Sequence, residues 1–268
     1  MIDVHAHILY GVDDGSKDEA MSLAMLRKAA ASGTQAIFAT SHVLQAGRHA
    51  AWQELLGGVQ ALRSLAEQNS INLAIYSGAE VFMDWDLLPE LAVEGSYCLN
   101  GEQYGKQPCT YILVELPMQF IPAYADAFWY ELRLKGVLPI LAHPERYPEL
   151  MAKPERLLAW RKDGLLLQCN AGSFAGAFGE AAQQAAKLLL KNGLVDLLGS
   201  DAHRATGRDT DMRAGAEAIS ALAGAAELKR IAVSNAQELL KGQAIAYQLP
   251  AKFISQDEKK SFWRRFFA

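Results

Sequence analysis

The feature that most constrains the fold of this chain is a repeated alternation of short aliphatic runs with longer segments of helical periodicity. Apolar residues that recur every three to four positions indicate amphipathic helices, whereas short runs rich in β-branched residues indicate buried strands. Strands that alternate with helices form right-handed βα units and a parallel sheet. The seven predicted strands are 2–5, 35–40, 72–78, 111–116, 137–143, 165–170 and 194–200.

Helices are expected between these strands, at about 50–67, 122–135, 154–163, 179–192 and 211–223. The first helix is expected to begin at a capping box of Ser16 and Glu19 and to end before Gly33. The polar, Gly-rich segment 94–108 is expected to be a surface excursion. Because no break in composition divides the units, we predict one α/β domain over 1–250, a seven-stranded (β/α)7 TIM-like barrel, followed by a tail over 251–268.

The composition limits the partners, the cellular location and the state of the cysteines that can be expected. A formal net charge of −4 argues against a surface that coats nucleic acid. The first twenty residues lack the features of a signal peptide, and no apolar run reaches the roughly 18–20 residues that span a bilayer, so a cytoplasmic protein is expected. Cys98, Cys109 and Cys169 are too scattered for a disulfide framework and are expected to be reduced core residues.

Every predicted strand ends in polar side chains that can bind metal or phosphate. In a parallel barrel the carboxyl ends of the strands converge at one mouth, so these side chains are expected to meet there. A lone histidine is usually structural, but so many at equivalent positions, beside acidic residues, predict a metal site. The strand-end residues in question are His5, His7, His42, His143, His203, Glu80, Glu115 and Asp201.

The first strand and the loop after it show how such a site can be assembled. His5 and His7 are two positions apart, which places both side chains on one face of a strand. One of the following acids could add a ligand: Asp13 can cap the first helix, while Asp14 is free to point inward. A set of imidazoles and carboxylates without thiolates suits manganese, iron or zinc, and its size suffices for two or three ions with a bridging carboxylate. The sixth histidine, His49, has no partner motif and is expected to be an exposed loop residue.

The order of these motifs resembles that of the polymerase-and-histidinol-phosphatase (PHP) superfamily. More narrowly, the chain is similar to the manganese-dependent protein-tyrosine phosphatases that bacteria encode with capsule and exopolysaccharide genes. The similarity extends from residue 1 to about residue 240, and GVDDG and HPERY separate this branch from the histidinol phosphatases. It rests on MIDVHAHILYGVDDGS at 1–16, ATSH at 39–42, SGAE at 77–80, LVEL at 113–116, AHPERY at 142–147 and SDAH at 200–203.

The resemblance implies a distorted seven-stranded barrel that holds three divalent metal ions. Manganese is the first expectation, with iron, zinc or magnesium as alternatives. The implied ligand sets are His5, His7, Glu80 and Asp201 for one ion, Glu80 as a bridge with Glu115 and His143 for a second, and Asp14, His42 and His203 for a third.

The resemblance also implies that Arg146 and Arg208 hold the substrate phosphate. Family members often have prolines after the second arginine, where this chain has Asp209 and Thr210, and Arg204 is a competing candidate. Three divalent ions and two arginines would outweigh the ligand carboxylates, so the pocket would attract a phosphate dianion although the whole chain is acidic.

The implied activity is hydrolysis of phosphotyrosine, with in-line attack by a metal-bound hydroxide. The implied substrate is a phosphotyrosine protein, in particular a membrane-associated bacterial tyrosine kinase that regulates capsule or exopolysaccharide synthesis. No cysteine begins a Cys-x5-Arg loop, which excludes a cysteinyl-phosphate intermediate. Two alternatives remain open: a PHP phosphoesterase for histidinol phosphate or a nucleotide, and a non-catalytic, metal-dependent regulator that binds a kinase.

The end of the tail, residues 259–267, combines four cationic with four aromatic side chains. One interpretation is a terminal helix whose aromatic rings pack on the barrel. The other is weak peripheral contact with a membrane, in which the rings insert at the headgroup level and the cations meet anionic lipid.

Overall fold

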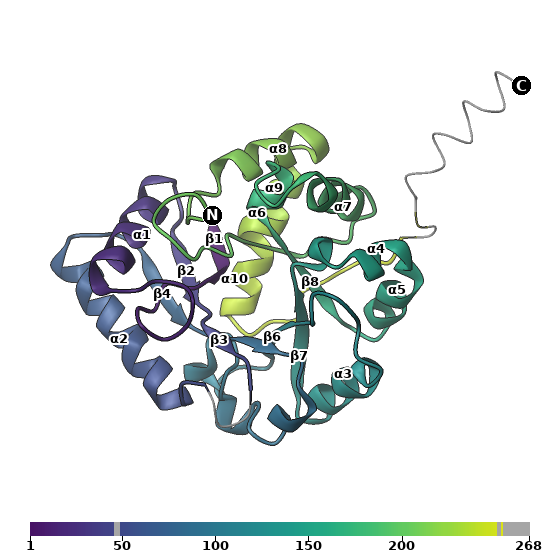
Figure 1. Cartoon of the computed structure of the whole chain (residues 1–268), viewed down its shortest axis with the longest axis horizontal. Helices are drawn as coiled ribbons and strands as arrows, with labels where there is room; N and C mark the ends of the chain where they lie inside the picture. The colour runs from purple at the N-terminus through teal and green to yellow at the C-terminus, as the bar shows by residue number, and fades with distance from the viewer. Residues whose placement is uncertain (46–48, 251–252, 254–268) are drawn as a thin grey trace, which may run out of the picture.

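The computed structural model describes residues 1–45, 49–250 and Phe253, and it shows a curled parallel sheet surrounded by helices (Figure 1). The predicted α/β class and parallel sheet are confirmed, since every strand pair recorded in the described residues is parallel. The strands are β1 (Ile2–Ala6), β2 (Ala36–Ala39), β3 (His42–Val43), β4 (Ala74–Ser77), β5 (Glu80–Phe82), β6 (Thr110–Glu115), β7 (Val137–Ala142), β8 (Leu166–Asn170) and β9 (Leu197–Gly199).

Two of the predicted strands, 35–40 and 72–78, are each followed by a further short strand, β3 and β5, and the sheet has two hydrogen-bonded parts. One part has the order β1-β2-β4 and the other the order β3-β5-β6-β7-β8-β9. The break between β4 and β5 falls at Gly78, where an added Cβ would lie 2.7 Å from the Leu99 side chain and 3.2 Å from the Thr40 side chain, so a larger residue would require these side chains to shift. At the far edge Ala6 forms a bridge with Ala202, which brings β1 beside the chain that follows β9.

The helices lie around the sheet (Figure 1), and six of them overlap the helices predicted between strands. α10 lies in the middle of the ring, where Ala236 and Leu239 pack with Val4 and Phe38 in an apolar cluster among the strands. The helices are α1 (Glu19–Ala31), α2 (Trp52–Gln68), α3 (Ala125–Leu134), α4 (Pro148–Ala152), α5 (Pro154–Lys162), α6 (Ala171–Phe174), α7 (Glu180–Lys191), α8 (Arg213–Ala223), α9 (Ala225–Lys229), a π-helical turn (Arg230–Ser234) and α10 (Asn235–Leu240).

The start of α1 differs from the sequence prediction. Its N-cap is Asp18, whose side chain accepts a hydrogen bond from the backbone N–H of Met21 at 2.8 Å. Ser16 is buried and donates its hydroxyl to the backbone oxygen of Asp18, so the predicted capping box of Ser16 and Glu19 is wrong. Aspartate is as good an N-cap as serine, and it stands directly before the first helical residue.

The expectation of a surface excursion over 94–108 is also wrong in part. Tyr97, Cys98 and Leu99 are buried, between the short 3-10 turns Val93–Gly95 and Gly101–Gln103. Leu99 pairs with Tyr111 on β6 and joins the apolar cluster among the strands. A short apolar run inside a polar, Gly-rich stretch therefore anchors this loop.

The tail that was predicted over 251–268 is described only at Phe253, which packs against the main apolar core. The basic and aromatic residues at 259–267 lie outside the described residues. Within the described residues no helix is long and apolar enough to cross a membrane. A single domain over 1–250 remains our proposal.

Candidate metal centre

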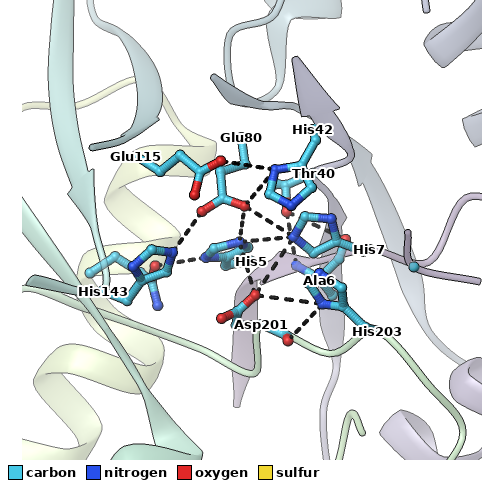
Figure 2. A network of polar contacts seen from close by, with 12 residues as sticks. His5, Ala6, His7, Thr40, His42, Glu80, Glu115, His143, Asp201 and His203 are labelled. Carbon is cyan, nitrogen blue, oxygen red and sulfur yellow. Dashed lines mark hydrogen bonds and ion pairs between the residues drawn. The ribbon is translucent and has the colours of Figure 1, made fainter. Parts of the chain in front are cut away.

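The ends of the strands bring a dense group of histidines and carboxylates to one mouth of the sheet (Figure 2). β1 and the residue after it supply two imidazoles, β3 begins with a third, and β5 and β6 carry the two glutamates. The remaining members follow β7 and β9. The structure thus brings together all eight residues predicted at the strand ends: His5, His7, His42, Glu80, Glu115, His143, Asp201 and His203.

Glu80 lies at the centre of this group. One of its carboxylate oxygens, Oε2, is 3.1 Å from His5 Nε2, 3.1 Å from His7 Nε2 and 3.2 Å from His42 Nδ1. The other, Oε1, is 2.8 Å from His143 Nε2. Glu80 is 1% exposed, and its Oε2 is a buried oxygen without a hydrogen bond of acceptable geometry. A buried carboxylate surrounded by four imidazoles has the geometry of a bridge between cations.

The electrostatics keep Glu80 in its anionic form. Burial would raise the pKa of this carboxyl, but the charge of His5 and the close imidazoles of His143 and His7 outweigh burial and hold it well below its usual range.

Neighbouring groups fix which nitrogen of His5 and of His7 faces the centre. His5 Nδ1 lies 2.8 Å from Gln168 Oε1, and His7 Nδ1 lies 2.8 Å from Asp13 Oδ2. An acceptor at Nδ1 keeps the N–H there and leaves the lone pair on Nε2. The two Nε2 atoms are only 3.2 Å apart, so both lone pairs point toward the same small volume. This arrangement fits a shared cation, because two acceptors at that distance otherwise repel each other.

Three groups of side chains place ligand atoms within 4.8 Å of one another. The group of His5, His7, Glu80 and Asp201 equals the set implied by the resemblance for the first ion. The group of His7, Asp14, His42 and His203 adds His7 to the set implied for the third ion. In the remaining group His42 occupies the place expected for His143, which instead contacts Glu80 from the other side. The groups are His5, His7, Glu80 and Asp201; His7, Asp14, His42 and His203; and His42, Glu80 and Glu115.

The two neighbouring acids after β1 have different surroundings. The Asp14 side chain is 71% exposed and its Oδ1 lies 3.4 Å from His203 Nε2, on the open side of the centre. Asp13 is not the cap of α1. Its Oδ2 accepts from His7 Nδ1 at 2.8 Å and from the backbone N–H of His42 at 2.9 Å, and its Oδ1 accepts from Gly15 N at 3.0 Å. Asp13 is therefore a positioning residue that the sequence interpretation missed.

Gly15, two residues later, is the sequence feature that could have indicated the role of Asp13. A Cβ at Gly15 would lie 2.4 Å from the backbone oxygen of His7, so the loop folds back tightly on the histidine. Such a tight turn returns a side chain at position 13 to the imidazole it follows.

Two of the clustered residues have strained backbones. His143 has φ of 34° and Asp201 has φ of 54°, in the left-handed region that costs a residue with a side chain about 1–3 kcal/mol. Asp201 is held there by Asn170, whose amide Nδ2 donates to Asp201 Oδ2 at 2.7 Å. Strain of this kind is typical of functional sites, where the surrounding contacts fix the side chain.

Burial and charge divide the imidazoles into two kinds. Burial lowers the pKa of His203, and the charges of His7 and Arg208 lower it further, to about 3. Burial also opposes the charged form of His7 and His42, but the neighbouring carboxylates of Asp13, Glu80 and Glu115 outweigh it and raise each pKa to about 9. A neutral imidazole such as His203 could accept a cation directly, whereas a cation at His7 and His42 would have to displace protons.

The two arginines predicted to hold phosphate reach the same centre. Arg146 Nη1 donates to Asp201 Oδ2 at 3.0 Å, and Arg208 Nε donates to the backbone oxygen of Asp201 at 2.7 Å. The ring of Phe178 lies against both guanidinium groups, 5.1 Å from Arg146 Cζ and 5.6 Å from Arg208 Cζ. Arg204 is exposed, and the described residues give its side chain no ion pair, so the geometry favours Arg208 over Arg204.

His49 lies apart from the centre, but it is not the exposed residue that was expected. Its side chain is 4% exposed, and its Nε2 lies 3.0 Å from the Tyr97 hydroxyl and 3.3 Å from Glu90 Oε2. These partners come from the buried part of the segment 94–108 and the turn before it, which the sequence did not place near His49.

The cysteines take no part in the group. Cys98 and Cys169 are buried and Cys109 is half-buried, and all three are free. Burial raises the pKa of the Cys98 thiol to about 12 and that of Cys169 well above its usual range. Neither buried thiol is therefore a nucleophile at neutral pH.

Comparison with known proteins agrees with this geometry. The family model "Capsular polysaccharide synthesis, CpsB/CapC" matches residues 1–241. The tyrosine-protein phosphatase YwqE of Bacillus subtilis is 32% identical over 253 residues, which cover 93% of this chain and 95% of YwqE. The tyrosine-protein phosphatase CpsB of Streptococcus pneumoniae is 26% identical over 250 residues, which cover 91% of this chain and 100% of CpsB.

A solved structure gives the same result. It comes from crystal structures of YwqE and CpsB, described as unique metal-dependent tyrosine phosphatases, and it matches this fold with a TM-score of 0.85 at 30% identity. The match covers 94% of this chain and 100% of that one.

Proposed function

Since the chain belongs to the CpsB/CapC family and is a metal-dependent tyrosine phosphatase of capsular polysaccharide synthesis, we propose that it works with three divalent metal ions, manganese in the first place. The observation that carries this proposal is Glu80, a buried anionic carboxylate in contact with four imidazoles. A single ion would leave part of this donor set unused, whereas several ions can share the carboxylate as a bridge.

We propose the following distribution of ligands. His5 and His7 share the first ion with Glu80 and Asp201, because the facing nitrogens of the two histidines converge. Glu115 and His143 complete a second ion on the other side of Glu80. Asp14, His42 and His203 hold a third at the open side, where Asp14 is exposed to solvent and can admit exchange of the ion.

The bound ions would supply a water nucleophile at neutral pH and neutralise charge on the phosphoryl group. The chain's own residues bind and orient the substrate. Arg146 and Arg208 approach from one side and can donate several hydrogen bonds to phosphate oxygens in a fixed planar geometry. The leaving group is a phenolate with a pKa of about 10, which departs more readily than an alkoxide.

The phosphotyrosine of a protein is the substrate, as the names of the related phosphatases indicate. We propose a membrane-associated bacterial tyrosine kinase as the protein that carries it. A cytoplasmic location and a weak membrane contact through residues 251–268 stay predictions. The alternatives of a histidinol or nucleotide phosphatase and of a non-catalytic regulator are not favoured, because more than nine tenths of the chain align with tyrosine phosphatases.

The test is elemental analysis combined with turnover of a phosphotyrosyl peptide. We expect about three metal equivalents per chain in active protein and loss of turnover after chelation, restored best by manganese. Glu80→Gln should lower metal content and turnover together, because a neutral amide cannot bridge two cations. Glu102→Gln, which removes a surface partner of Arg63, is the matched control and should change neither. Full turnover in chelated protein, or in Glu80→Gln, would contradict the proposal.

A further inference from the structure

A groove of about 1000 Å³ opens beside the metal centre. It runs between the turn Pro144–Arg146 with α4 on one side and α7 on the other, which occupy the same side of the barrel in Figure 1. Its lining is mainly apolar, with Met118, Pro148, Met151, Phe178, Leu188 and Phe253 among the contributors.

The groove is continuous with the corner proposed to hold the phosphate. Arg146 and Phe178 line both this groove and a smaller cavity of about 410 Å³ that also includes Arg208. A phosphate held by the two arginines would therefore lie at the inner end of the groove. In a protein substrate the residues next to phosphotyrosine must follow the surface away from that point, and the groove offers them a path.

The chemistry of the lining indicates what it can bind. Glu145, Arg146 and Glu180 are the charged residues among those that line the groove in the described part of the chain. Glu145 is buried and accepts hydrogen bonds from Asn170 N and Ser173 Oγ, and Arg146 faces Asp201. Most of the surface left for a ligand is apolar, with a carboxylate at Glu180. Such a surface favours apolar side chains and disfavours acidic ones.

The protein itself shows that an aromatic side chain fits there. Phe253 comes from the chain beyond the last helix, is half-buried, and packs against the main core while lining the groove. This position places an aromatic ring on the same apolar surface as Met151 and Leu188.

We propose that this groove is a peptide subsite, which binds an apolar residue flanking phosphotyrosine in the substrate protein. The inference rests on the proposed function, because it assumes that the phosphate is held at Arg146 and Arg208. It adds a determinant of substrate choice that lies outside the metal centre: the sequence around the tyrosine, read by Met151, Phe178 and Leu188.

The experiment uses the full-length, metal-loaded enzyme and three substrates. Two are phosphotyrosyl peptides that differ only in their flanking residues, leucine and phenylalanine in one and serine in the other. The third is p-nitrophenyl phosphate, which has no flanking residues. We expect a KM about tenfold lower for the apolar peptide, the order expected for partial burial of one large apolar side chain, with an unchanged kcat.

Leu188→Glu should remove this preference, because it places a carboxylate in the apolar lining, and it should leave p-nitrophenyl phosphate turnover unchanged. Leu134→Glu is the matched control: Leu134 is 63% exposed on α3 and does not line the groove, so the preference should survive. If Leu188→Glu does not fold by circular dichroism, Met151→Gln on α4 serves as the same test.

Equal KM values for the two peptides in the unmodified enzyme would overturn the subsite. Survival of the preference in a folded groove variant, or a parallel loss of p-nitrophenyl phosphate turnover, would overturn it as well. These results differ from failure of the proposed function, in which the metal-loaded enzyme would hydrolyse neither peptide.

Discussion

Asp13 offers a sharp test of how the loop after β1 prepares the metal centre. Its carboxylate is 5% exposed and serves three donors: His7 Nδ1 and His42 N at one oxygen, and Gly15 N at the other. Asparagine has the same shape but only one accepting oxygen. If that oxygen faces His7, the amide NH₂ opposes the Gly15 N–H. If it faces Gly15, the NH₂ opposes both other donors and favours the wrong tautomer of His7.

The less costly orientation is the one in which the amide oxygen faces His7. It keeps the His7 tautomer and leaves the Gly15 N–H without an acceptor. A group that orients a histidine ligand typically contributes 10–100-fold to metal affinity. We therefore expect a loss of about tenfold, or about 1.4 kcal/mol, for Asp13→Asn. Asp13→Ala removes the acceptor for all three donors and should approach about a hundredfold loss.

The measurement is titration of metal-depleted enzyme with Mn²⁺, followed by calorimetry and by recovery of phosphotyrosine turnover. Excess metal should restore kcat in both variants, because Asp13 contacts His7 and not the substrate. Asp18→Asn is the control, since it makes the same change of charge at the N-cap of α1, where asparagine also caps well. Wild-type metal affinity in a folded Asp13→Ala protein would refute the reasoning, as would a loss of kcat that saturating metal cannot restore.

Three further predictions follow from contacts elsewhere in the structure. Arg146→Ala and Arg208→Ala should each lower kcat/KM for phosphotyrosine by about 2–3 kcal/mol without lowering metal content, and a loss of metal in elemental analysis would instead make them structural. Replacing all three cysteines with alanine should leave kcat largely intact, so an inactive but folded and metal-replete variant would contradict a mechanism without a cysteine nucleophile. Asp196→Ala should destabilise the fold by about 3–5 kcal/mol in urea unfolding, because it leaves the fully buried guanidinium of Arg161 without its ion-pair partner; a loss below about 1 kcal/mol would show that Arg161 finds another acceptor.

The parallel architecture could be predicted because the predicted strands are short and apolar, and all but 72–78 are followed by a helix. The strand ends were equally informative, since the order of histidines and acids along the chain translates directly into one mouth of the sheet. The breaks after β2 and β4 were not predictable in this way. At the break after β4, the side chains of Leu99 and Thr40, which belong to other loops, lie close to Gly78.

The contacts between side chains of the metal centre could not be predicted from the sequence either. His42 lies 3.1 Å from Glu115 and 3.6 Å from Asp14, so it stands between two of the implied ligand sets, and spacing along the chain cannot express such a position. The same holds for His49, whose partners Tyr97 and Glu90 lie about forty to fifty residues away. Short helices such as α4, α6 and α9 have too few turns for periodicity to reveal them.

Asp201 connects two kinds of binding that are usually considered separately. It belongs to the proposed set of the first ion, and it also accepts hydrogen bonds from Arg146 and Arg208, the groups proposed to hold phosphate. A cation that takes over the carboxylate weakens its hold on both guanidinium groups and frees them to bind an anion. Metal and phosphate should therefore bind with positive cooperativity, and reciprocity requires phosphate to raise metal affinity by the same factor. Inorganic phosphate, a reaction product, would then help to retain the ions between turnovers.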